Sequence, residues 1–190
     1  MILIAGGDAD PSISCLVTRL KERNLPSQVL RVGASGAPRL IWHLNEDTLE
    51  IASDIMAPTA LFLRYDVFTY LQNGKMESKQ RAGRWYHTLL SWGMAHPDIA
   101  MFNRRYGARQ TMKPHVLCLA QQFGLSIPKT LISNDLKRLQ ELPNGIDNWI
   151  TKPVEGGEYT QPLPKALSDE VMERRMRGSP TIIQERLVGP

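Results

Sequence analysis

Two lysines in the second half of the chain are spaced so that they could hold a phosphate chain. Lys113 opens a predicted helix, and Lys152 lies in a predicted strand that leads directly into a glycine-containing turn. Proteins meet the negative charges of a nucleoside triphosphate with lysines and backbone N–H groups. Because lysine carries a compact charge on a long stem, two lysines from separate elements can reach one phosphate chain. A lone lysine is usually a solvated surface group, so it is the pair that indicates nucleotide binding.

Gly156 and Gly157 follow Lys152 in a turn-rich segment. Glycine lets the backbone approach a ligand closely and can adopt positive φ, so this turn could lie against a bound ligand. An ordinary hairpin turn is the alternative, and the residues leave both interpretations open.

Arg64 and Asp66 lie just past a predicted buried strand in the first half of the chain. Ligands gather at the carboxyl ends of strands in parallel α/β sheets, so a peptide or acid substrate could be bound there. A salt bridge at a sheet edge is the alternative interpretation of the same two residues, and the simpler one. The histidines show no metal-ligand spacing and no Ser–His–Asp arrangement is present, so we assign neither metal ligands nor catalytic residues within the chain.

The elements that position these residues follow from hydrophobic periodicity. Residues 1–5 and 28–32 are predicted strands around a helix with apolar residues at 13, 16, 17 and 20, which is the β-α-β pattern of a parallel sheet. Further predictions are helices at 80–93, 111–123 and 134–142 (the last one capped) and strands at 60–65, 128–132, 149–153 and 181–185. Trp85 and Trp92 share one helix face and are expected to pack in the core or at a domain interface. A change in the local sequence pattern near residue 100 predicts a domain boundary.

Composition restricts the class of protein. The chain has 190 residues, 42% hydrophobic and 22% charged, with a net charge of +4, which is ordinary for a globular protein. No nucleic-acid module accompanies the modest basic excess, and no run approaches the roughly 18 apolar residues of a membrane span. Cys15 and Cys118 are far apart and are expected to be buried free thiols, which favours the cytoplasm.

The order of these motifs resembles the central domain of the ATP-grasp superfamily. The resemblance is carried by Lys113 with the passage Gly124-Leu125-Ser126-Ile127-Pro128-Lys129-Thr130, by Lys152 with its glycines, and by Gln184-Glu185-Arg186-Leu187. It is closest to the ligases that add glutamate to a ribosomal protein tail and to those that close ester and amide rings in graspetide (microviridin-like) peptides. The first hundred residues resemble the preceding pre-ATP-grasp domain at Phe62–Phe68 and Asn103-Arg104.

The resemblance implies an α/β fold in three parts. These are a parallel-sheet pre-ATP-grasp domain at 1–100, an α+β central domain at 101–178, and an adenine-hinge strand at 179–190 that starts a largely absent C-terminal domain. Lys113 and Lys152 would contact the α- and β-phosphates, and Gly156 and Gly157 would cover them. In the hinge, Gln184 and Glu185 lead to Arg186 and Leu187, whose main chains would recognise adenine.

The implied activity is an ATP-dependent carboxylate–amine or carboxylate–hydroxyl ligase that works through an acyl phosphate on a peptide or amino acid, as in RiPP biosynthesis. ATP and Mg²⁺ are the implied cofactors. The chain ends where the family's magnesium ligands are expected to begin, so we expect an incomplete ligase without turnover of its own. The alternatives are a non-catalytic partial ATP-grasp module that binds a peptide or partner protein, and an unrelated α/β protein whose lysines are accidental. A fold that ends after its last strand leaves apolar surface and an unpaired edge, so we expect a homodimer or aggregation, with Ile182 and Ile183 as the residues that become covered.

Overall fold

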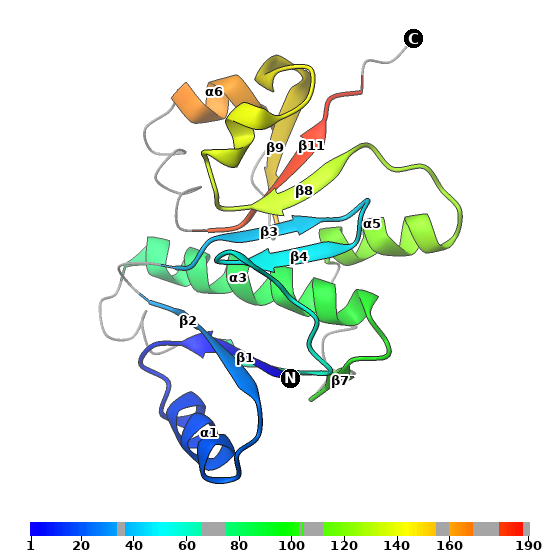
Figure 1. Cartoon of the computed structure of the whole chain (residues 1–190). Coiled ribbons are helices and arrows are strands. Elements are labelled where there is room, and N and C mark those ends of the chain that lie inside the picture. The colour runs from blue at the N-terminus through cyan, green and yellow to red at the C-terminus, as the bar shows by residue number, and fades with distance from the viewer. Residues whose placement is uncertain are drawn as a thin grey trace. The chain divides into compact units, whose positions relative to one another are not determined.

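The computed structural model describes residues 1–33, 37–65, 75–102, 104, 112–154, 160–168 and 179–187. The chain forms two compact units, coloured along the sequence in Figure 1. The first unit contains Met1–Pro38 and Ala57–Thr111, and the second contains Arg39–Met56 and Met112–Pro190. The sequence-based boundary near residue 100 instead assigns all of residues 1–100 to one domain.

The first unit is built on a parallel sheet. Its strands are β1 (Ile2–Gly7), β2 (Ser27–Val32), β6 (Ala60–Leu63) and β7 (Ala100–Met101), in the order β2-β1-β6-β7 with every neighbouring pair parallel. Helix α1 (Pro11–Glu22) connects β1 to β2, and helix α3 (Met76–Ala95) precedes β7. The predicted β-α-β opening and the α/β fold class are confirmed.

The two helices cover opposite faces of this sheet. Ile4 of β1 packs with Ile13 of α1, while α3 comes so close to Leu61 that a Cβ on Gly93 would lie 2.8 Å from the Leu61 side chain. Successive residues of a strand point to opposite faces of the sheet. Phe62 therefore points towards α1, and Leu61 points towards α3. Trp85 and Trp92 are buried, which confirms that the tryptophans of α3 are core residues.

The second unit is an antiparallel sheet of seven strands, in the order β10-β9-β11-β8-β3-β4-β5. Its strands are β3 (Leu40–His43), β4 (Thr48–Ile51), β5 (Asp54–Ile55), β8 (Thr130–Ser133), β9 (Trp149–Pro153), β10 (Gln161–Pro162) and β11 (Thr181–Glu185). Its helices are α5 (Lys113–Gln122) and α6 (Leu163–Ser168). Pro114 lies in the first turn of α5, where its missing N–H costs nothing.

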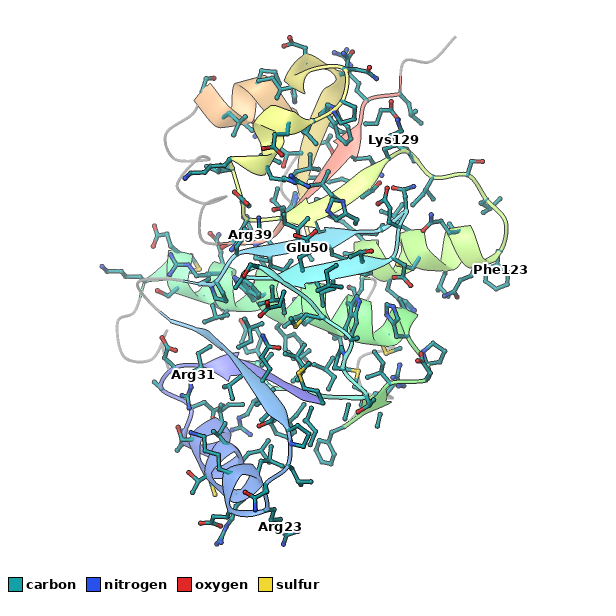
Figure 2. The ribbon with its side chains drawn as sticks, in the orientation of Figure 1. Arg23, Arg31, Arg39, Glu50, Phe123 and Lys129 are labelled. Carbon is teal, nitrogen blue, oxygen red and sulfur yellow. The ribbon has the colours of Figure 1, made fainter. Side chains whose placement is uncertain are left out.

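Residues 39–56 belong to the second unit because β3 pairs with β8. Ile41, Trp42 and His43 are the antiparallel partners of Ser133, Ile132 and Leu131. Arg39 adds ion pairs to Glu50 at 3.1 Å and to Asp135 at 3.3 Å, and Figure 2 shows Arg39 and Glu50 side by side. A pairing between strands this far apart in sequence produces no local sequence pattern. The domain boundary predicted near residue 100 therefore does not reflect this pairing.

The prediction that β11 is an unpaired edge is wrong. β11 lies between β9 and β8, with antiparallel partners on both sides. Ile182 and Ile183 are both 0% exposed, so the chain's own sheet and its covering elements bury them. The apolar edge on which the homodimer prediction was based is therefore not present at β11.

The predicted helix at 134–142 is also wrong. That stretch contains only a 3₁₀ turn at Arg138–Glu141, followed by a second one at Ile146–Asn148. Asn134, the expected cap, instead accepts a hydrogen bond at its side-chain Oδ1 from the N–H of Leu40 at 2.8 Å. Asn144 and Gly145 then take φ values of 63° and 75°, which no right-handed helix accommodates.

The two cysteines differ from each other. Cys118 is buried as expected, whereas Cys15 is exposed, and both are free thiols. Burial, with a smaller contribution from Asp47, raises the pKa of Cys118 to about 12, so this thiol is a core residue and not a nucleophile. No helix in the part of the chain described here is long and apolar enough to cross a membrane.

The N-terminal cap of α1 gives a stability prediction. Asp10 is fully buried, accepts a hydrogen bond from the N–H of Ser12 at 2.8 Å, and pairs with Arg64. Asp10→Ala removes both interactions, whereas Asp10→Asn keeps a capping side chain. We expect Asp10→Ala to lower the free energy of unfolding by about 1 kcal/mol more than Asp10→Asn does, the usual value of a cap, in urea denaturation followed by circular dichroism. Equal losses in the two variants would show that the cap contributes nothing.

Candidate functional site

The structure brings together the two lysines that the sequence pairs. Lys113 begins α5, and its Nζ donates a hydrogen bond to the carbonyl oxygen of Pro153 at 3.1 Å, one residue beyond Lys152 in β9. Burial and, secondly, the positive charge of Lys113 lower the pKa of Lys152. The two ammonium groups are therefore close enough to repel each other. Two cations held side by side form a local site of positive potential.

Lys152 is held by a chain of neutral polar groups that crosses three strands. Its Nζ donates to Oε1 of Gln184 at 2.7 Å, and Nε2 of Gln184 donates to Oγ1 of Thr130 at 2.9 Å. The Thr130 hydroxyl in turn donates to the carbonyl oxygen of Pro128 at 2.7 Å. Because a lysine only donates, its contact sets the orientation of the Gln184 amide.

This chain holds Lys152 in place without neutralising it. Among the residues that the structure describes, no carboxylate pairs with Lys152. Gln184 is buried, and its amide oxygen accepts a hydrogen bond from the ammonium group. The positive charge of Lys152 thus remains available to an anion while its side chain is held by a buried partner.

The main chain just after β11 has groups that the sheet does not use. The backbone hydrogen bonds of the sheet continue to the end of the strand. The N–H of Glu185 donates to the carbonyl oxygen of Lys129 at 2.9 Å, and the N–H of Arg186 donates to the carbonyl oxygen of Asn148 at 2.8 Å. The next two groups, the carbonyl of Arg186 and the N–H of Leu187, have no hydrogen-bond partner within the described ranges. Both residues are exposed. These two groups belong to one trans peptide, so the carbonyl and the N–H point in opposite directions.

The remaining predicted site residues lie elsewhere. Gly156, Gly157 and Asp66 fall outside the described residues. Arg64 forms a 2.5 Å ion pair with the buried Asp10 in the first unit, which is the salt bridge at the sheet edge that was the alternative interpretation of this residue. A substrate role for Arg64 stays a prediction.

The sequence did not lead us to expect that the side chains of Thr130 and Gln184 help to hold Lys152. Gln184 was expected only as a residue of the adenine hinge. Their signal was available: Gln184 directly follows two isoleucines within one strand. A polar residue in a buried strand requires a hydrogen-bond partner, because an unsatisfied buried amide is costly. The partner itself could not be named without the register.

No group of three or more His, Cys, Asp or Glu side chains within the described ranges is arranged to hold a metal ion.

Comparison with known proteins finds neither a matching family model nor a matching curated protein. The chain is similar to solved structures of ATP-grasp ligases. The ligase PsnB, complexed with minimal precursor, Mg and ADP, is 21% identical over 99% of this chain and 66% of that chain, with a TM-score of 0.36. The macrocyclase MdnC, bound with precursor peptide MdnA from Microcystis aeruginosa MRC, is 16% identical over 98% and 68%, with a TM-score of 0.36.

A third similar structure is a Chryseobacterium gregarium RiPP-associated ATP-grasp ligase in complex with ADP and a leader and core peptide. It is 15% identical over 97% of this chain and 62% of that chain, with a TM-score of 0.35. The chain thus spans about two thirds of the length of these ligases. Identities and TM-scores this low do not transfer an activity, so a function has to be argued from the site itself.

The repulsion between the lysines predicts a measurable shift. Lys113→Gln removes a positive charge that disfavours the charged form of Lys152, so we expect the pKa of Lys152 to rise towards its ordinary value. The measurement is a pH titration of the lysine side-chain NMR signals. Lys137→Gln, which removes an exposed lysine elsewhere in the same unit, is the matched control and should leave that pKa unchanged. An unaltered pKa in Lys113→Gln would place the two ammonium groups too far apart for the proposed site.

Proposed function

We propose that the second unit binds ATP through Lys113 and Lys152, and that the protein serves as an ATP-dependent carboxylate–amine or carboxylate–hydroxyl ligase acting on a peptide or amino acid. The observation that carries the proposal is the lysine pair itself. Two neighbouring ammonium groups repel each other, and one of them is fixed by the neutral amide of Gln184. A polyphosphate relieves that repulsion and supplies acceptors for both cations.

The main chain at Arg186 and Leu187 is the proposed place for adenine. The carbonyl of Arg186 and the N–H of Leu187 are not used by the described residues. Because the two groups belong to one trans peptide and point in opposite directions, one of them at a time can face the edge of a base. Recognition by main-chain groups does not depend on the side chains, so the exposed Arg186 and Leu187 are compatible with it.

The role of this chain in a ligase would be to bind and orient the nucleotide. In such a reaction a substrate carboxylate attacks the γ-phosphate, and the resulting acyl phosphate is then taken by an amine or hydroxyl group. Lys113 and Lys152 would fix the phosphates that stay behind as ADP and stabilise the charge that develops on them. Magnesium, when bound, supplies further charge neutralisation, and we assign none of its ligands to the described residues.

The wider setting is also proposed. The solved ligases with precursor peptides bound make a peptide the preferred substrate class to test. The unpaired thiols of Cys15 and Cys118 favour the cytoplasm as the compartment. The homodimer stays a prediction without a surface assigned to it.

Nucleotide binding is tested by isothermal titration with a non-hydrolysable ATP analogue. A charge-assisted hydrogen bond contributes about 1.5–3 kcal/mol, so Lys113→Gln and Lys152→Gln should each weaken binding by roughly tenfold to a hundredfold. Lys137→Gln is the matched control and should bind like the parent protein. Gln184→Glu should also weaken binding, because it places a carboxylate on the ammonium group of Lys152 at the position of the present 2.7 Å contact. Binding that survives all three site variants would remove the lysine pair from the nucleotide site.

The lowered pKa of Lys152 predicts a pH dependence. Lys152 loses its proton at a lower pH than an ordinary lysine, and a bound polyphosphate favours the charged form. Affinity for the ATP analogue should therefore fall as pH rises through the pKa of Lys152, with proton uptake on binding above neutral pH. Titrations in buffers of different ionisation enthalpy measure that uptake. The proton uptake should be lost in Lys152→Gln, and its persistence there would assign it to another group.

A further inference from the structure

A cavity of about 390 Å³ lies in the second unit, away from the lysine pair. Its size falls within the range of roughly 300–1,000 Å³ that is typical of small-molecule sites. Both apolar and polar residues line the cavity. The apolar lining residues are Leu131, Leu142, Pro143 and Trp149, and the polar ones are His43, Asn45, Glu46, Lys129, Thr130, Arg138 and Glu141.

The sheet separates this cavity from the lysine pair. Directly paired residues of antiparallel strands point to the same face, and successive residues alternate between faces. Lys152 is opposite Ile182, whereas Leu131 is opposite Ile183. Leu131 and Trp149 pack with Ile183 in one core cluster, so they are on the face that Lys152 and Gln184 do not share. A ligand in the cavity would therefore be distinct from a nucleotide held by the lysines.

The cavity lies beside the connection from β8 to β9, which contains two 3₁₀ turns where the sequence predicts an α-helix. Leu139, in the first 3₁₀ turn, is 1% exposed and fills the core, but the chain then turns away through Pro143 and the positive-φ residues. The indole N–H of Trp149 donates to the carbonyl oxygen of Pro143 at 3.0 Å. Because the polar atom of Trp149 is already satisfied, its ring offers the cavity an apolar surface.

Most polar groups around the cavity are already paired. Arg138 forms an ion pair with Glu141 at 2.5 Å, and the nitrogens of His43 lie 3.8 Å from Glu46 and from Glu50.

The side chains of Asn45 and Lys129 each keep a hydrogen-bond donor that no described residue uses. Oδ1 of Asn45 accepts from the N–H of Thr130 at 3.0 Å, which leaves its Nδ2 group unused. Nδ2 of Asn45 and Nζ of Lys129, which Figure 2 labels just before β8, have no partner in the described part of the chain. One of them is the cation Lys129, which within the described ranges forms no ion pair with either lining carboxylate, because Glu46 lies beside His43 and Glu141 pairs with Arg138.

We propose that this cavity binds an organic carboxylate with an apolar body, which packs against Leu131 and Trp149 while the carboxylate meets Lys129 and Asn45. The apolar walls account for the body, and the two unused donors account for the acid. A free apolar acid and the C-terminal residue of a peptide share this chemistry. The inference does not rest on ATP binding, because it uses the other face of the sheet.

The test follows the indole N–H signal of Trp149 in ¹H–¹⁵N NMR spectra while 4-phenylbutyrate is added, with the signal assigned from Trp149→Phe. The Trp149 signal should shift, and those of the buried Trp85 and Trp92 in the first unit should not. Lys129→Gln should weaken binding by about tenfold, the value of one charged contact. Lys137→Gln is the matched control, since both lysines are exposed and Lys137 does not line the cavity.

Two comparisons define what would overturn the proposal. 4-Phenylbutanol has the same apolar body without the charge and should bind at least about tenfold more weakly. Equal binding of acid and alcohol, an unchanged affinity in Lys129→Gln, or no shift at Trp149 would each contradict a carboxylate site.

Further titrations separate the two sources of the carboxylate and the two sites. A short peptide ending in phenylalanine that binds more tightly than N-acetylphenylalanine would assign the site to peptide C-termini, and the reverse order would assign it to free acids. The C-terminal amide of the same peptide should not bind. A saturating ATP analogue should leave the affinity for 4-phenylbutyrate unchanged, so failure of nucleotide binding and failure of this site are distinguishable.

Discussion

The position of β11 between β9 and β8 is the constraint on which the rest of the second unit depends. With partners on both sides, its register places Gln184 where it can reach Lys152 on one strand and Thr130 on the other. The same register ends the ladder at Arg186 and leaves the next main-chain carbonyl and N–H unused. It also places Ile183 on the opposite face, in the core cluster beside the cavity. A shift by one residue would exchange the two faces and dismantle all of these features.

The partial burial of Lys152 distinguishes the lysine pair from ordinary solvated surface lysines. A half-buried lysine beside a second cation carries an electrostatic cost, which appears as the lowered pKa of Lys152. A carboxylate partner would remove that cost, yet Lys152 is held by a neutral amide instead. Such an arrangement suits a site whose counter-charge arrives with a ligand, and perturbed cations of this kind gather at functional sites. Structural ion pairs such as Arg64 with Asp10 show the opposite pattern, because both charges are supplied by the protein.

The two faces of the antiparallel sheet therefore have separate chemistry. One face presents the lysine pair and its chain of neutral acceptors. The other packs a core of Ile41, Leu131 and Ile183 and, where two 3₁₀ turns replace a helix, leaves a cavity bordered by Trp149. The β3–β4 segment contributes His43 and Asn45 to that cavity, although it precedes most of the first unit in the sequence.

The choice of Lys113 and Lys152 as a pair came from the order and spacing of motifs along the second half of the chain. Local sequence patterns alone determined the parallel opening, α5 with Pro114 in its first turn, and the buried tryptophans of α3. These features follow from side-chain periodicity and residue type, which act over a few neighbours. Only the tertiary structure decided that Arg39–Met56 joins the second unit, that Ile182 and Ile183 are covered, and that Gln184 holds Lys152. Each of these depends on which distant strands pair and in which register, and the free energy of that pairing comes from contacts between segments far apart in the chain, which local periodicity does not encode.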